Sequence, residues 1–254
     1  MKRTLVIALL AAGLLAVAIA VLAPAALVAP YLERATRGLL AASEVGGTLW
    51  RGQGVLGVGS ARLPMAWTVD AAPLLTGEVH VHVTPVDGTS PSPRADVTAA
   101  GQRLALSDVA IVVPAGVLQE ALMRNAAVRA RWAADGEITA TTSRLEWTPA
   151  AYSGDLRVVW RGARLTPVSA PAIDLGEASA TLAARGEQLA GPVVNSGGNL
   201  DLRGDVAIGT HGGATISLLL TPRRADDAEL ARTLAAIGTP EGAGWRVNWQ
   251  TRPQ

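Results

Sequence analysis

The chain has 254 residues, of which 49% are hydrophobic and 17% are charged, and its formal net charge is +1. The absence of cysteine excludes a disulfide-stabilised scaffold. Lys2 and Arg3 carry two positive charges, so the rest of the chain has a net charge of −1 without a basic cluster, which excludes nucleic-acid binding.

An uncharged apolar run over residues 5–32 follows Lys2 and Arg3. At about 1.5 Å per residue, a helix from residue 5 to Val28 would be roughly 36 Å long, which is enough to cross a hydrocarbon core of about 30 Å. The sequence therefore predicts a cytoplasmic start and a single transmembrane anchor over residues 1–32.

A cleaved secretory signal peptide is the alternative for this run. Such peptides also begin with basic residues and end at small ones, such as those at 18–20 or 23–25. Their apolar region has about 7–15 residues and is shorter than this run, so a retained anchor in the inner membrane is favoured. In both cases Lys2 and Arg3 hold the N-terminus in the cytoplasm, so residues 33–254 are expected to form a periplasmic domain.

Helix-forming residues continue over 31–43, where no strand alternation occurs, and they predict a short helix that stops at Gly46 and Gly47. Beyond it, apolar and polar residues alternate with a period of two, which places one row in a core and the other in water. The clearest case has Val79, Val81 and Val83 inward, with Glu78, His80 and His82 outward. The segments with this pattern are 48–50, 65–69, 77–83, 103–113, 136–147, 155–160, 179–184, 199–208 and 215–220.

Short strands separated by Gly, Pro and Asp predict a mainly β fold, with an antiparallel sheet-rich domain behind the anchor. Residues 114–125 and 225–237 have helical spacing instead and predict two short helices packed on the sheet. We interpret residues 88–93 as a hairpin loop rather than a linker between subdomains, because strand patterning resumes on both sides.

Tryptophan is nearly the only large aromatic residue, since the chain has two Tyr and no Phe. Each indole ring can bury roughly 150–250 Å² while its N–H needs a partner, so each is expected to mark a strand at the edge of a core. The seven are Trp50, Trp67, Trp132, Trp147, Trp160, Trp245 and Trp249.

The glycines at 52, 54 and 57 match the text of the dinucleotide-binding fingerprint, and Asp70 follows at a suitable distance. That fingerprint works only where the last glycine opens a helix whose N-terminus faces the pyrophosphate. Residues 58–64 contain glycine, proline and strand-forming residues instead. We therefore interpret this segment as a glycine-rich strand or bulge.

His80 and His82 would share one face of a strand, but a metal site needs at least a third ligand, and His211 is the only other histidine. We interpret the pair as solvent-facing. Asp226 and Asp227 fit the start of a helix. With no cysteine and no Gly-x-Ser-x-Gly motif, we predict no catalytic, cofactor-binding or metal residues, and we expect a protein that is not an enzyme.

Short motifs occur in a specific order behind the apolar run. They are Gly47-Thr48-Leu49-Trp50-Arg51-Gly52, Leu145 with Trp147, Gly154, Trp160 with Gly162, Leu175-Gly176, Asn195 with Gly197, Gly198 and Leu200, then Gly204, Pro222, Leu230, Leu234 and Gly238. This order resembles the type II secretion system protein N (general secretion pathway protein N) family over nearly the full length.

The resemblance implies an inner-membrane component of the machine that moves folded exoproteins from the periplasm through an outer-membrane secretin. It implies protein–protein contacts with other inner-membrane secretion components and with the secretin. The family supplies no catalytic residues to carry over, and the resemblance implies no cofactor.

A lipid-binding function is the alternative. Anchored periplasmic proteins with repeated amphipathic strands can form a curved sheet that shelters acyl chains, as in AsmA-like lipid-bridge proteins. An apolar groove without a core behind it would favour lipid, whereas a closed core with exposed sheet edges would favour protein partners.

Overall fold

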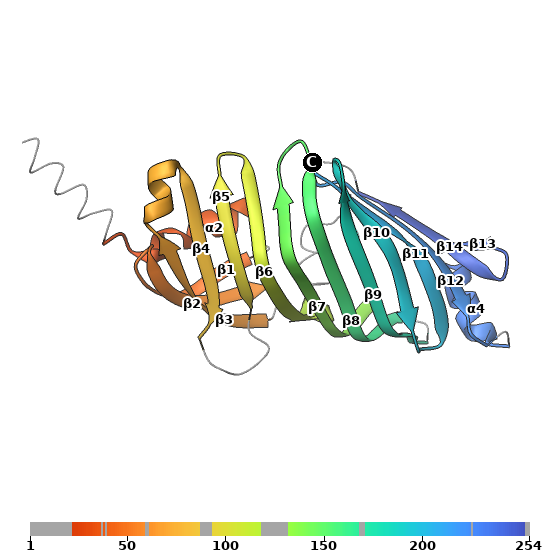
Figure 1. Ribbon diagram of the computed structural model, residues 1–254. Coiled ribbons are helices and arrows are strands. Elements are labelled where there is room, and N and C mark those ends of the chain that lie inside the picture. Colours follow the sequence, from red (N-terminus) through yellow and green to blue (C-terminus); the bar gives the residue numbers. More distant parts are fainter. Residues whose placement is uncertain are drawn as a thin grey trace, which may run out of the picture.

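One long antiparallel sheet dominates the computed structural model, and its strands follow one another in chain order except that β14 lies between β12 and β13 (Figure 1). The structure describes residues 22–36, 38, 40–58, 61–86, 93–117, 132–167, 171–224 and 226–251. Every sequential pair of strands up to β12 is also a pair in space, so the sheet is built from hairpin connections, of which the longest, residues 115–131, joins β6 to β7.

We divide the described chain into two halves. The N-terminal half holds η1 (Ala25–Leu27), α2 (Ala29–Ala35), β1 (Leu40–Gly47), β2 (Arg51–Val58), β3 (Ala61–Asp70), η2 (Ala72–Thr76), β4 (Glu78–Pro85), β5 (Arg94–Ala100) and β6 (Arg103–Pro114). The C-terminal half holds β7 (Trp132–Trp147), β8 (Tyr152–Pro167), β9 (Ile173–Arg185), β10 (Gln188–Ser196), β11 (Leu200–Gly209), β12 (Ala214–Pro222), α4 (Ala228–Ala235), β13 (Thr239–Glu241) and β14 (Gly244–Gln250).

The mainly β, antiparallel fold class is confirmed, and all but the first of the segments predicted from alternation form strands, although residues 77 and 199 lie just before theirs. The glycine-rich segment is strand β2, as interpreted. The hairpin interpretation of residues 88–93 is supported because Val83 and Ala95 face each other across β4 and β5. Residues 87–92 lie outside the described part of the chain.

One N-terminal prediction is right only over residues 31–35, and a second is wrong. The helix predicted over 31–43 ends with α2, and its last residues belong to β1, where pairing with the glycine-rich β2 overrides their helical preference. Residues 48–50, predicted as a strand, form the turn between β1 and β2. Gly47 turns the chain there at φ +89°, and the Thr48 hydroxyl accepts a hydrogen bond from the Arg51 amide at 3.2 Å.

The predicted apolar helix does not continue to Val28. Pro24 has extended backbone and forms an isolated β-bridge with Thr48, and Ala25, which is 1% exposed, packs within the domain. Proline fixes φ and lacks the amide that a helix interior needs, which explains the break. Residues 1–21 lie outside the described residues, and no described helix is long and apolar enough to span a membrane.

The helix predicted over 225–237 is confirmed as α4. The Asp227 carboxylate accepts a hydrogen bond from the Leu230 amide at 3.0 Å and so caps its N-terminus. Of the helix predicted over 114–125, residues 115–117 are helical, whereas Pro114 ends β6 and residues 118–125 lie outside the described part.

The tryptophan prediction holds for three residues. The indole N–H groups of Trp67, Trp147 and Trp160 donate to the carbonyls of Leu49, Thr210 and Asp135 at 3.2, 3.1 and 3.0 Å, respectively. Trp132 on β7 and Trp245 on β14 also pack against the core, but the buried Trp245 nitrogen finds no partner among the described residues. The prediction fails at Trp249, which is 47% exposed. Trp50 lies in a turn rather than a strand.

Candidate functional site: the inner face of the sheet

The register of the strands gives the sheet one apolar face, which we call the inner face. Val81 lies opposite Val97, Val97 opposite Leu106, and Leu106 opposite Leu145, so an apolar row crosses β4 to β7. Directly paired residues point to the same side of a sheet. The other side, the outer face, carries the polar row that includes His82.

A cavity of about 440 Å³, the N-terminal cavity, lies on the inner face of the N-terminal half. The residues that line it come from η1, α2, η2 and β1 to β4, and all of them are apolar. Val79, Val81 and Val83 form one wall, which confirms that these valines face inward on β4. The sheet curls at this end, so that the first strands turn back toward β4 (Figure 1).

Trp67 forms a second wall of the N-terminal cavity, and two local features hold its ring in place. Its indole N–H donates to the Leu49 carbonyl in the β1–β2 turn. Gly52 lies directly opposite Trp67, and a Cβ there would collide with the ring. This glycine of the fingerprint-like segment therefore serves close packing, and no helix follows β2 to bind a nucleotide.

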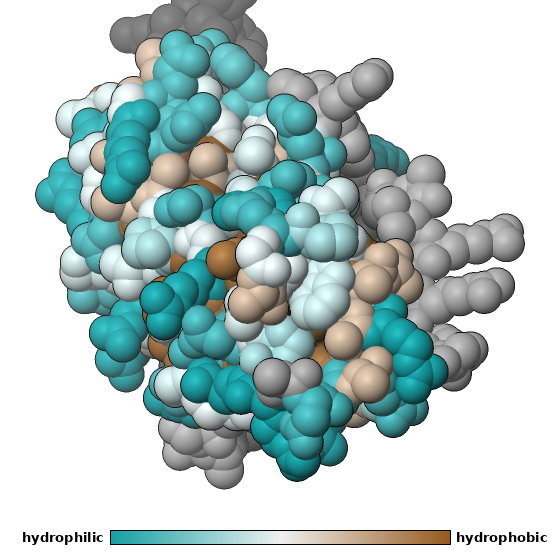
Figure 2. All heavy atoms as spheres, turned by 90° about the vertical axis from the view of Figure 1, so that its right-hand side faces the viewer, coloured by the Kyte–Doolittle hydropathy of each residue, from teal (hydrophilic) through white to brown (hydrophobic). Residues whose placement is uncertain are grey.

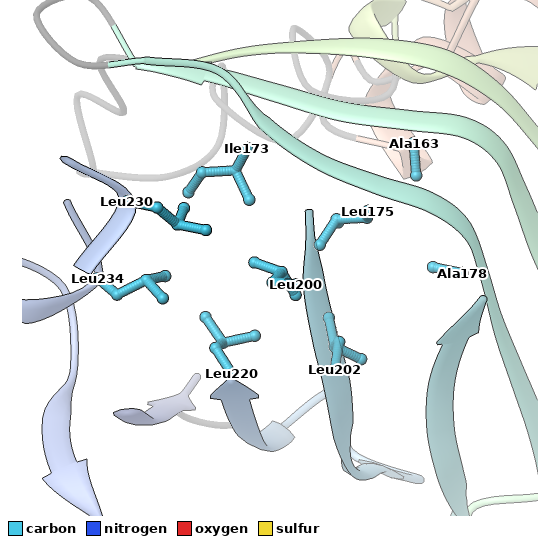
Figure 3. Close-up of a cluster of buried hydrophobic side chains, with 9 residues drawn as sticks. All are labelled: Ala163, Ile173, Leu175, Ala178, Leu200, Leu202, Leu220, Leu230 and Leu234. Atoms are coloured by element: carbon cyan, nitrogen blue, oxygen red, sulfur yellow. The ribbon is translucent and has the colours of Figure 1, made fainter. Parts of the chain in front are cut away.

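A second cavity of about 410 Å³ lies on the inner face of the C-terminal half, and its lining is also apolar. Here a true core lies beside the cavity. Leu230 and Leu234 of α4 are buried against the sheet next to Ile173, Leu200 and Leu220 (Figure 3). Viewed from this end, the surface is mostly hydrophilic, and the strongest hydrophobic colour is confined to recesses (Figure 2).

The outer face carries a compact acid–histidine group on β3, β4 and β5. His82 Nδ1 lies 2.6 Å from Asp96 Oδ1, and His82 Nε2 lies 3.1 Å from Asp70 Oδ2. The hydrogen bond to Asp96 and then that to Asp70 raise the pKa of His82 above its ordinary value. When protonated, His82 donates from both ring nitrogens, which leaves neither free for a metal.

His80 shares the outer face with His82, as predicted, and lies 3.2 Å from Glu78. His211 lies in the turn between β11 and β12, seven strands away along the sheet. Among the described residues, no three His, Asp or Glu side chains are placed to hold a metal ion together.

The two edges of the sheet differ. Helix α2 packs beside β1 at one edge. At the other edge, the three-residue β13 pairs only with residues 244–246 of β14. No described strand pairs with the outer side of residues 247–250, so their backbone groups offer a short free edge.

Asn195, one of the residues that carry the family resemblance, holds the backbone of three strands together. Its side-chain nitrogen donates to the carbonyls of Leu175 and Leu200 at 2.7 and 3.0 Å, and its oxygen accepts from the Leu202 amide at 2.7 Å. Gly176 adopts a left-handed conformation beside this cluster. These motif residues therefore stabilise the fold rather than form a reactive site.

These observations define a class: a single-sheet β protein with an apolar inner face, a polar outer face and one free edge. The family model of the type II secretion system protein N matches residues 39–248, which include nearly the whole sheet, and the chain belongs to this family. No curated protein and no solved structure shows a significant match.

The sequence predicted no site residues, so the residues that line the two cavities were not identified as a candidate site. The usable signal was the row of valines on β4, which repeats on its neighbours. That row predicts an apolar face, but only the curl of the sheet encloses space beside it.

Proposed function

We propose that the chain is an inner-membrane component of the type II secretion system that assists the export of folded exoproteins by contact with other secretion proteins, without turnover of a substrate. The family match over residues 39–248 carries this proposal. The absence of substrate turnover in this proposal is supported by the acid–histidine group of His82, Asp70 and Asp96, because both ring nitrogens of His82 are already engaged with the two carboxylates.

A membrane attachment by residues upstream of the sheet is part of the proposal. Residues 5–21 contain no charged side chain, and as a helix of about 1.5 Å per residue they would be roughly 26 Å long, close to the thickness of a hydrocarbon core. With Pro24 as the break, the anchor would end before η1, and the sheet would lie in the periplasm.

A fusion experiment tests this topology. Alkaline phosphatase fused after Gln254 should be active, and the full chain should stay with the membrane after a carbonate wash. Recovery of a shortened, soluble form would support the signal-peptide alternative instead.

The free edge formed by residues 247–250 is the proposed contact for another secretion component. Unpaired N–H and C=O groups at a sheet edge accept an added strand, and neighbouring side-chain pockets give such contacts specificity. The exposed Trp249 offers a large aromatic contact beside this edge.

Site-specific cross-linking tests the contact. A photoreactive residue in place of Asn248 should capture periplasmic parts of inner-membrane secretion components or of the secretin. The same residue in place of Thr181, which is exposed on β9, a strand with a neighbour on each side, serves as the control. Equal capture from both positions, or export that is intact after gene deletion, would contradict the proposal.

The AsmA-like lipid-bridge alternative receives no support from the family match. A bridge also needs a groove that is open along its length, whereas α4 packs onto the inner face of the C-terminal half. Intact export combined with altered outer-membrane permeability after deletion would nevertheless favour this alternative.

A further inference from the structure

We propose that the N-terminal cavity holds one acyl chain of a membrane phospholipid. The inference rests on the proposed membrane attachment, but not on the role in secretion. It starts from the cavity walls, which consist of apolar residues from six successive elements and from η1.

The chemistry of the walls selects a hydrocarbon over a peptide. The strands that form the walls use their backbone groups in the sheet, so an occupant meets only apolar side chains. A peptide would bring amide and carbonyl groups, and burying these without partners is costly. A hydrocarbon chain brings none, so it loses no hydrogen bonds on entry.

The size of the cavity fits one chain. Its volume of about 440 Å³ lies near the lower end of the range for small-molecule sites, roughly 300–1,000 Å³. This space is too small for a helix with its side chains.

The position of exposed apolar side chains points to a membrane as the source. Six of the ten large hydrophobic residues that are exposed in the described chain lie on or beside η1, α2 and η2. They are Leu22, Leu27, Val28, Tyr31, Leu75 and Val79. Val28 and Val79 also line the cavity, so the exposed apolar patch is continuous with its walls. Patches of this kind mark contacts with proteins or membranes.

The patch also lies where the chain continues toward its uncharged residues 5–21. A chain end that enters a bilayer keeps the adjoining surface close to lipid. An acyl chain could then pass from the membrane into the cavity without crossing water.

A photolabelling experiment tests the inference. The full chain is placed in vesicles that contain phosphatidylethanolamine with a diazirine near the end of one acyl chain, and the labelled residues are mapped by peptide mass spectrometry. We expect label on Met65 and Val81, which face the cavity from β3 and β4.

A matched pair of variants separates cavity binding from general contact with lipid. Ala42 on β1 lines the cavity, whereas Ala41 points to the opposite face and is exposed. Ala42→Phe should lower labelling of Met65 and Val81 about tenfold, equivalent to about 1.4 kcal/mol of binding free energy, while Ala41→Phe should leave it unchanged. If Ala42→Phe does not fold, Ala29→Leu fills the cavity from α2 instead.

Equal labelling in the two variants would overturn the inference. So would label confined to residues 5–24, or a photoreactive residue at position 65 that captures residues 5–21 of the same chain. Export does not enter any of these measurements, so failure of the secretion role would be seen separately.

Discussion

The two halves of the sheet follow the same alternation of apolar and polar residues, yet they bury their apolar face to different extents. Of the fifteen hydrophobic residues that are buried in the described chain, eleven belong to the C-terminal half. Leu200 and Leu234 are 0% exposed there, whereas Val79 on the inner face of the N-terminal half is 37% exposed.

The difference has two physical sources. The C-terminal half presents leucines on its inner face, and α4 adds Leu230 and Leu234 over them (Figure 3). The N-terminal cavity also has large residues in its walls, but Ala25 is the only hydrophobic lining residue there that is fully buried, because no leucine-rich α-helix like α4 closes over it in the described part of the chain. We infer that the C-terminal half supplies most of the stability, and that the N-terminal half keeps an apolar surface available for binding.

The largest expected effect compares one leucine from a helix in each half. Leu234→Ala should lower the free energy of unfolding by about 2–5 kcal/mol, because it empties a fully buried position. Leu32→Ala in α2 should cost about 1 kcal/mol, because Leu32 is only partly buried at the cavity wall. Denaturant unfolding of the full chain in detergent measures both.

Alanine favours helices, so neither change penalises the helix itself. Similar losses in the two variants would break the comparison and show that the N-terminal half is packed as firmly as the other.

The second effect sharpens the comparison within the C-terminal half. Gly176 and Gly186 have similar left-handed backbones, with φ of +69° and +62°. A Cβ on Gly176 would meet the backbone of Ser196 and Gly197, whereas one on Gly186 would meet nothing within 4 Å. Gly186→Ala should cost about 1–2 kcal/mol from the left-handed backbone alone, and Gly176→Ala should cost clearly more.

Thermal unfolding of both variants checks this difference. Equal melting temperatures for the two variants would mean that the backbones of β9 and β10 move apart easily at Gly176. The C-terminal half would then not be the rigid part of the sheet.

Local pattern predicted much of the fold. Alternation placed Val79, Val81 and Val83 on one face, and helical spacing with Asp227 at its start placed α4. Where the fold depends on partners distant in sequence, prediction failed. Residues 40–43 have helical preferences and become strand because β2 pairs with them.

The candidate site depended on the same distant relations. No residue of the N-terminal cavity carries a chemical motif, since all of its lining is apolar. The cavity exists because the sheet curls and brings α2 and β1 toward β4. The alternation of apolar and polar residues along a strand does not predict how strongly a sheet curls. The acid–histidine group was equally invisible, because Asp70 and Asp96 reach His82 only through the register of β3, β4 and β5.

The smallest expected effect concerns pH and the N-terminal half. The hydrogen bonds from His82 to Asp96 and Asp70 raise its pKa above 6.5, the value expected for the unfolded chain. Their contribution to stability is therefore complete below about pH 6.5 and is lost as pH rises through the higher pKa of the folded state. Because the His82 side chain is 42% exposed, we expect no more than about 1 kcal/mol.

Melting temperatures of the full chain, measured from about pH 5.5 to pH 9, test this effect. The wild-type value should fall by about 2–4 °C across that window, and His82→Gln should remove the fall. His211→Gln is the matched control, because His211 lies in a turn of the C-terminal half and has no ion pair among the described residues. If the fall in melting temperature persists in His82→Gln and disappears in His211→Gln, the titrating group is His211 in the C-terminal half, and the prediction is wrong.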